Sequence, residues 1–330
     1  EALKAFRPLP KPVGEPLVVV DGVRSGLGNG RNAFSASQNG ILSYRTNFFG
    51  NGTRHRWYSR AGKPGIATEL GNNLAAELSP DGKRAAITTG LHLQIWILDT
   101  ATGALSQATN DAYNAGDAAA WSPDAKRLVY QAVKGINQTV VGSGTGSLVY
   151  ASGVPLQWLR SGILIRDKGA IELLPAPPEG SSQPVTAAPK VLTRLSVDQV
   201  QVSPDEKWVA YSRQAGASRD IWIAAFPSFA SPRKVAKGEQ PRWRGDGREL
   251  FLYTDPTGIS AVDVKVENDL ATGVPHVVLS TPTLAIGSGT FFRYDVARDG
   301  QSFLVRERDQ AVAVQESLQM IVNWPSLLSK

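Results

Sequence analysis

The 330-residue sequence contains no cysteine, one methionine (Met320) and three histidines. Without cysteine there can be no disulfide bridges, thiolate catalysis, cysteine–zinc sites or iron–sulfur clusters. No apolar run approaches the ~18 residues that a membrane-spanning helix requires. Because the chain starts at Glu1 and its single methionine lies near the other end, we expect a processed or excised piece, with any signal peptide or anchor upstream.

Charge is also sparse, at 19% of residues with a formal net charge of +6. The lysines and arginines are scattered and form no basic stripe of the kind that a phosphate backbone requires, so we expect no nucleic-acid partner. Apolar residues make up 42% of the chain, which is enough for a large core and excludes a disordered protein.

One short sequence motif, which we call the turn phrase, recurs along the chain. Its clearest copies are Ser79–Arg84, Ser122–Arg127 and Ser203–Trp208. Each of these copies begins Ser-Pro-Asp, and looser copies end at Gly40, Gly162, Gly247 and Gly300. The seven turns follow one another at an average spacing of about 43 residues, which is typical of β-propeller blades.

The chemistry of the phrase favours a tight hairpin turn. Proline presets one backbone angle, aspartate suits the next position, and glycine accepts a positive φ. Short β-type segments flank the turns, for example 75–78 and 85–88, and a third apolar segment such as 95–98 follows. Ala125 and Glu206 stand where the turn favours glycine, and we expect plainer turns there because other residues rarely adopt a positive φ.

These units predict an all-β fold, a seven-bladed β-propeller with four-stranded antiparallel blades, or six blades if the degenerate fourth unit is not one. We expect a linker at 1–15, one propeller domain at 16–324 and a tail at 325–330. The blades are expected near 34–70, 75–109, 117–151, 154–189, 198–236, 240–281 and 291–324. The N-terminal strand at 16–20 is expected to pair with the last blade and close the ring.

The Ser-Pro-Asp-Gly phrases resemble TolB-like propeller repeats over about residues 16–324. The segments 14–19, 33–45 and 240–251, with 294–296 and 323–324, also resemble the C-terminal propeller module of bacterial membrane-anchored serine/threonine kinases. This resemblance implies an extracytoplasmic sensor or interaction domain, attached to the membrane only through an upstream anchor. The chain contains no His-Arg-Asp or Asp-Phe-Gly triplet, so any kinase core would lie upstream.

We therefore expect a non-catalytic propeller that binds a small molecule, a glycan, a peptide or a protein partner. A lyase or hydrolase with acids and arginines in the central funnel is one alternative. A periplasmic scaffold that binds a peptide in the channel is another. The dispersed positions of His55, His92 and His276 favour neither a metal site nor another cofactor, and no Gly-x-Ser-x-Gly elbow supplies a nucleophile.

The loops opposite the Ser-Pro-Asp turns are the expected binding face, because exposed loops that gather aromatic and arginine side chains commonly form recognition surfaces. The candidate ligand-binding residues on this face are Asn73, Tyr113, Asp117, Arg213, Glu239, Phe292 and Arg293. Further loop residues expected nearby are Phe48, Phe49, Arg54, Asn72, Asn114, Asp198, Arg219, Gln240 and Phe291.

Overall fold

The computed structural model describes residues 34–37, 39–44, 53–68, 73–89, 94–109, 119–254, 258–266, 270–280, 292–308 and 319–323. Every regular element within these ranges is a β-strand, which confirms the all-β expectation. None of this part of the chain forms a helix that is long and apolar enough to cross a membrane. The expected linker at 1–15, the closing strand at 16–20 and the tail at 325–330 lie outside the described residues.

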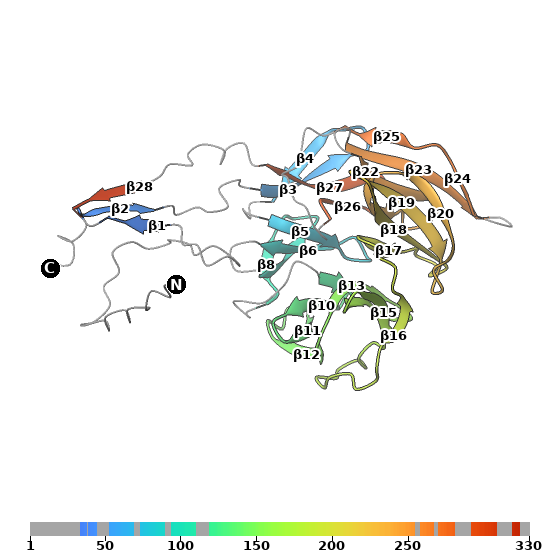
Figure 1. Ribbon diagram of the computed structural model, residues 1–330, viewed down its shortest axis with the longest axis horizontal. Coiled ribbons are helices and arrows are strands. Elements are labelled where there is room, and N and C mark those ends of the chain that lie inside the picture. Colours follow the sequence, from blue (N-terminus) through green and yellow to red (C-terminus); the bar gives the residue numbers. More distant parts are fainter. Residues whose placement is uncertain are drawn as a thin grey trace, which may run out of the picture. The chain divides into compact units, whose positions relative to one another are not determined.

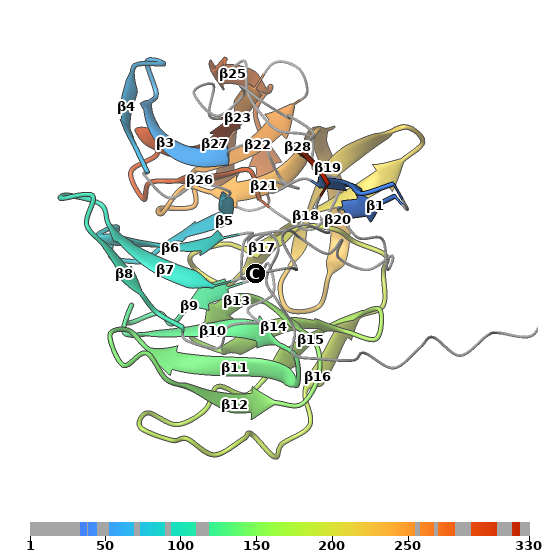
Figure 2. The ribbon, with the colours of Figure 1, turned by 90° about the vertical axis from the view of Figure 1, so that its left-hand side faces the viewer.

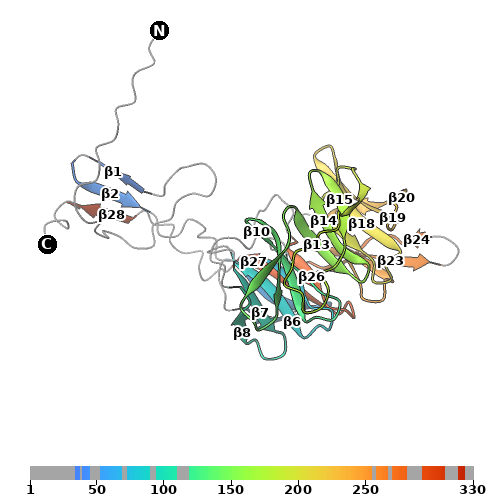
Figure 3. The ribbon, with the colours of Figure 1, turned by 90° about the horizontal axis from the view of Figure 1, so that it is seen from below.

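The chain divides into two units, one formed by residues 51–311 and one by 1–50 together with 312–330. Within the described residues the larger unit contains six antiparallel sheets, and many of their strands are labelled in Figure 1. Two of them consist of β5 (Asn73–Leu78), β6 (Arg84–Thr89), β7 (Ile95–Asp99) and β8 (Leu105–Gln107), and of β9 (Ala119–Trp121), β10 (Arg127–Ala132), β11 (Gly135–Val140) and β12 (Gly146–Tyr150). Figure 3 shows β6, β7 and β8 of the first sheet.

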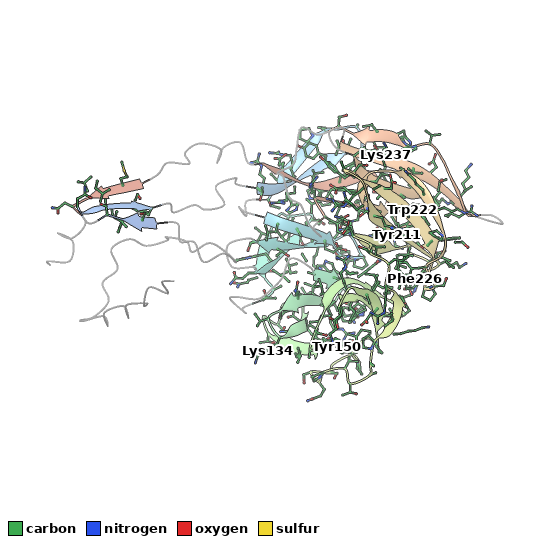
Figure 4. The ribbon with its side chains drawn as sticks, viewed as in Figure 1. Lys134, Tyr150, Tyr211, Trp222, Phe226 and Lys237 are labelled. Atoms are coloured by element: carbon green, nitrogen blue, oxygen red, sulfur yellow. The ribbon has the colours of Figure 1, made fainter. Side chains whose placement is uncertain are left out.

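Two more sheets follow along the chain. They consist of β13 (Val154–Leu159), β14 (Gly162–Asp167), β15 (Ala170–Leu174) and β16 (Lys190–Thr193), and of β17 (Val200–Val202), β18 (Trp208–Ala215), β19 (Ser218–Ala225) and β20 (Ala230–Lys237). Figure 4 labels Tyr211 and Trp222, which are directly opposite each other on β18 and β19.

The remaining two sheets complete the larger unit. One consists of β21 (Glu239–Trp243), β22 (Glu249–Thr254), β23 (Gly258–Val266) and β24 (Leu270–Thr272), with β25 (His276–Leu279) also paired to β23. The other joins segments from both ends of the unit, β26 (Tyr294–Val296), β27 (Ser302–Arg308), β3 (Thr53–Ser59) and β4 (Pro64–Ala67).

Neighbouring sheets pack through their first strands and through shared apolar side chains. The strands β5, β9, β13, β17, β21 and β26 contact one another in this order, and β26 also contacts β5. Figure 2 shows the sheets of this unit following one another around its centre. The core lies between the sheets, where Leu164 of β14 and Val209 of β18, for example, belong to one buried cluster.

The smaller unit contains a three-stranded sheet of β1 (Phe34–Ala36), β2 (Ile41–Tyr44) and β28 (Gln319–Val322). The range 34–70, expected to form one blade, is therefore divided between two sheets, because β2 pairs with β28 while β3 pairs with β27. The ladder between β3 and β27 is long and unbroken, running from Ser302↔Ser59 to Arg308↔Thr53. Because this ladder is long, β3 forms more backbone hydrogen bonds with β27 than it could form with the short strand β1 or β2.

The repeated phrase forms the predicted hairpin turn. In the first copy Ser79 Oγ donates to Asp81 Oδ1 at 2.5 Å, and Asp81 Oδ1 also accepts from Lys83 N at 3.0 Å. Ala125 and Glu206 have φ of 58° and 57°, close to the 70° of Gly82, so the expectation of plainer turns at these two positions is wrong. The Ser–Asp hydrogen bonds recur in all three copies and hold the left-handed conformation even where glycine is absent.

Gly135 and Gly82 both have positive φ but differ in their surroundings. A Cβ on Gly135 would lie 2.1 Å from the backbone oxygen of Tyr150, whereas a Cβ on Gly82 would meet nothing within 4 Å. Gly82→Ala is expected to lower the free energy of unfolding by about 1 kcal/mol, the cost of the left-handed backbone alone. Gly135→Ala is expected to cost at least about 3 kcal/mol, because β11 and β12 must also separate. Urea unfolding of the two variants checks this, and equal losses would contradict it.

Arginine and tryptophan side chains stack between adjacent sheets at the ends of the turns. The Arg84 guanidinium lies 5.2 Å from the Trp121 ring, and that of Arg127 lies 4.7 Å from the Trp158 ring. In the third copy of the phrase Trp208 replaces the arginine and shares a groove with Trp243. The tryptophans therefore belong to the inter-sheet packing, as cation–π contacts of this kind stabilise neighbouring elements.

Candidate functional site

Six side chains occupy equivalent places near the ends of the first strands, and we call them the bridging row. The row consists of Glu77, Ala120, Gln157, Gln201, Arg242 and Asp295. Three of these side chains bond directly to the backbone of the next sheet. Gln157 Oε1 accepts from Val202 N at 2.8 Å, Gln201 Oε1 from Trp243 N at 2.6 Å, and Asp295 Oδ2 from Leu78 N at 2.6 Å. These three hydrogen bonds therefore link each of the three sheets to the next one.

The charged members of the row meet in one cluster. Arg242, whose side chain is only 4% exposed, places Nη2 at 2.8 Å and Nη1 at 3.3 Å from the two carboxylate oxygens of Glu77. Its Nε lies 3.4 Å from Asp295 Oδ1, and its guanidinium carbon lies 3.7 Å from the Phe292 ring centroid. One buried guanidinium thus lies between two carboxylates, and the cluster carries one excess negative charge when both acids are ionised.

The excess charge shifts the proton affinity of the cluster. Burial raises the pKa of Glu77 to about 7; Arg242 opposes this shift and Asp295 adds to it. Burial alone would lower the pKa of Arg242, but Asp295 and Glu77 outweigh it, so the net shift is upward and Arg242 stays cationic. We therefore expect the cluster to take up a proton near neutral pH, on Glu77.

Glu77→Gln is expected to flatten the pH dependence of stability. A carboxyl with a raised folded pKa contributes stability that is fully present below about 4.3 and is lost as the pH rises through about 7. One pKa unit corresponds to about 1.4 kcal/mol. The Glu77 side chain is 26% exposed, and solvent screening reduces the full effect. We therefore expect the free energy of unfolding of the wild-type protein to fall by about 2 kcal/mol as the pH rises through about 7. Urea unfolding between pH 4.5 and 8 measures it, with the exposed Glu179→Gln as control; parallel curves for wild type and Glu77→Gln would contradict it.

Two cavities flank the bridging row along the first strands. On the side away from the turns a cavity of about 120 Å³ is lined by Ala75, Ala76, Ala119, Val200 and residues of β13. On the turn side a second cavity of about 380 Å³ is lined by Leu78, Val202, Trp243 and Val296. Glu77 lines both cavities, so the charged cluster separates them.

Arg166 of β14 also lines the cavity away from the turns. Its Nη2 donates to the carbonyl oxygens of Val197 at 3.1 Å and Asp198 at 3.2 Å. Burial lowers the pKa of Arg166, and the nearby charge of Asp198 opposes the shift. Within the described residues no carboxylate forms an ion pair with this guanidinium.

The residues predicted from the sequence lie in several settings. Phe292 lines the cavity away from the turns and stacks on Arg242. Glu239 pairs with Arg219 at 2.9 Å and with Arg293 at 3.2 Å, and Arg219 also pairs with Asp198 at 3.0 Å. These four charged residues were expected on one face, and the structure joins them in one ion-pair network.

The other predicted residues lie elsewhere. The Arg213 guanidinium lies 6.0 Å from the Trp222 ring, and Arg213 does not line the cavity. Asn73 begins β5 opposite Thr89. Tyr113 and Asp117 lie outside the described residues.

Sequence reasoning missed Glu77, Arg242, Asp295 and Arg166. The first three stand just before the turn phrase or its looser copies, at a place where other repeats carry alanine or glutamine. Aligning the repeats on the turns would have revealed this place as one that carries a charged residue in three repeats, each followed by an apolar residue. Arg166 has no such signal, because it lies on a second strand at a position that other sheets fill with varied residues.

Two of the three histidines lie within the described residues. His55 is fully buried on β3 and His276 is exposed on β25, while His92 lies outside the described residues. In the part of the chain that the structure describes, no three His, Asp or Glu side chains are grouped as metal ligands would be.

No protein-family model and no curated protein matches this sequence. Among solved structures, TolB from Acinetobacter baumannii is similar at 13% identity and a TM-score of 0.48, over 83% of this chain and 79% of that protein. Oligogalacturonate lyase from Vibrio parahaemolyticus is similar at 10% identity and a TM-score of 0.47, over 84% of this chain and 97% of that one. The identities and TM-scores are too low for the activity of either protein to be transferred to this chain.

Proposed function

We propose that the unit at 51–311 is a six-bladed β-propeller that binds a ligand, without catalysis, in the cavity away from the turns. The six sheets and the cyclic order of contacts among β5, β9, β13, β17, β21 and β26 support the six blades. The expected first and seventh blades are each divided between the two units: β3 and β4 join β26 and β27 in one sheet of this unit, while β1 and β2 pair with β28 in the smaller unit.

The observation that carries the binding proposal is the lining of the cavity. Its residues come from several sheets that are distant in the sequence, such as Ala75, Ala119, Val154 and Val200, with Phe292 preceding β26. Ligand sites are typically concave, mostly apolar and provided with a few polar groups that fix orientation. This cavity has that character, with apolar walls and with Arg166 as a polar group.

Blocking the cavity tests the proposal. Ala119→Phe places a large ring into the cavity, and Ala101→Phe, on an exposed turn, is the matched control. Ligands found by screening a fragment library against the wild-type protein by NMR are expected to lose at least tenfold in affinity in Ala119→Phe and to keep it in Ala101→Phe. Unchanged affinity in Ala119→Phe, with the fold intact by circular dichroism, would refute the cavity as the site.

A lyase or hydrolase is the second candidate, and one observation favours it. Glu77 lines both cavities and has a pKa raised to about 7, which suits a general base at neutral pH. Turnover of an oligosaccharide panel by the wild-type protein, lost at least 100-fold in Glu77→Gln, would favour this candidate over the binding module. The Arg242 pair already occupies both oxygens of Glu77, which is why we place binding first.

We further propose an extracytoplasmic location and a role as the sensor of a receptor-type serine/threonine kinase. The support is the resemblance of segments 33–45 and 240–251 to such propeller modules. The reading frame upstream of Glu1 tests it: we expect one membrane span and a kinase core. A frame that encodes neither, with pull-down of an envelope protein complex instead, would favour the alternative of a periplasmic assembly scaffold.

A further inference from the structure

We propose that the ligand of the cavity carries a carboxylate on a small apolar body, and that Arg166 binds this carboxylate. The inference rests on the proposed binding function of the cavity and names its ligand class. Three properties of the cavity carry it: the charge of Arg166, the pairing of the other arginines and the size of the space.

Arg166 offers a cation whose hydrogen bonds go to neutral acceptors. Its two hydrogen-bond partners are the carbonyl oxygens of Val197 and Asp198, both bonded through Nη2. A guanidinium has five N–H donors in a planar fork that matches a carboxylate, so donors remain for a ligand. Because this half-buried side chain lines the cavity, an entering carboxylate would give the guanidinium an ion-pair partner that the described residues do not supply.

The neighbouring arginines are already neutralised by carboxylates of the protein. Arg242 is bound to both oxygens of Glu77, and Arg219 pairs with Asp198 and Glu239. Asp198 thus contributes its carbonyl to Arg166 and its carboxylate to Arg219. Glu77, the carboxylate that lines the same cavity, has its charge offset at short range by Arg242 and does not neutralise Arg166.

The space limits the size of the ligand. The cavity measures about 120 Å³, and an apolar protein cavity of about 150 Å³ accepts benzene, so a group of about six non-hydrogen atoms fits. The walls include Val154, which is paired with Arg166, together with Leu156, Val200 and the small side chains of Ala75 and Ala119. A short branched alkyl group attached to a carboxylate matches both the volume and the lining.

Isobutyrate and isobutyramide test the charge requirement, because they have the same shape and number of non-hydrogen atoms. Titration of the ¹⁵N-labelled full chain, followed by NMR shifts of the arginine side-chain N–H groups, measures both affinities. The wild-type protein is expected to bind the acid at least tenfold more tightly than the amide. In Arg166→Gln, which retains an N–H₂ for the two carbonyls, the two affinities should become equal, while Arg166→Lys should keep part of the preference and Arg213→Gln all of it.

The outcomes separate this inference from the proposed function. If Ala119→Phe abolishes binding of both probes but acid and amide bind equally to the wild-type protein, the carboxylate inference is overturned and the binding site stands. If neither probe binds the wild-type protein, the carboxylate inference is also overturned. A preference that persists in folded Arg166→Gln would overturn the role of Arg166.

A further arm distinguishes the two sources of such a carboxylate, a free small acid and the C-terminus of a peptide. The probes are Gly-Gly-Val with a free carboxyl group and the same tripeptide as its C-terminal amide. Tighter binding of the free tripeptide than of isobutyrate, lost on amidation, would identify a chain terminus. Weaker binding of the tripeptide than of isobutyrate would identify a free acid; either result supports the class of ligand.

Discussion

Arg242→Met is expected to lower the free energy of unfolding by about 3–5 kcal/mol, the usual cost of removing one partner from a buried ion pair. The guanidinium is only 4% exposed and lies between Glu77 and Asp295. Methionine fills much of the volume but leaves two neighbouring carboxylates without a cation. Their repulsion and desolvation act at the junction of three adjacent sheets, those of β5, β21 and β26.

Chemical denaturation measures the loss, and Arg160→Met is the matched control because that side chain is 66% exposed. The control is expected to lose no more than about 1 kcal/mol, the usual value of a surface ion pair. Combining Arg242→Met with Glu77→Gln and Asp295→Asn should recover part of the loss, because the triple variant no longer buries unpaired charge. A loss below about 1 kcal/mol in Arg242→Met alone would show that the cluster does not stabilise the sheets.

The hairpins could be predicted from the sequence because their determinants are local. Serine, proline and aspartate at fixed offsets form the turn through contacts such as that between Ser79 and Asp81, and the apolar segments on either side form its strands. The partners of the outer strands could not be predicted in this way. The pairing of β3 with β27 joins residues about 250 positions apart. The spacing of the repeats does not indicate whether β3 pairs with this distant strand or with β1 and β2, which are its neighbours in the sequence.

The candidate site shows the same division between local and long-range information. Phe292, Glu239 and Arg293 were expected on the binding face because loops enter the first strands there, and the structure joins Glu239 to Arg293 and places Phe292 at the cavity. Arg242 and Glu77 were missed because nothing in the sequence around either residue points to the other. Only the packing of sheets distant in the sequence brings them together, 165 residues apart.

His55→Ile is expected to make the protein more resistant to acid. His55 is 0% exposed, and neither of its ring nitrogens has a hydrogen-bond partner among the residues that the structure describes. It occupies on β3 the place that Ile95 occupies on β7, since the backbone N–H of each donates to a threonine hydroxyl, Thr68 or Thr109, at 3.1 Å. Burial and, to a smaller extent, the charge of Arg306 together lower the pKa of His55 to about 3. The folded protein therefore keeps this imidazole neutral.

The sign of the effect follows from the depressed pKa. The unfolded chain binds a proton on His55 below about 6.5 and the folded chain does not, so the wild-type protein loses stability as the pH falls from about 6.5 towards 3. Between pH 7 and pH 4 this loss amounts to about 3 kcal/mol at about 1.4 kcal/mol per pKa unit. Isoleucine does not titrate, so urea unfolding of His55→Ile should lack this component, whereas His276→Ile, at an exposed position, should retain it. A wild-type pH profile parallel to that of His55→Ile would mean that the folded protein opens to protonate the ring, and that this histidine is not held as a core residue.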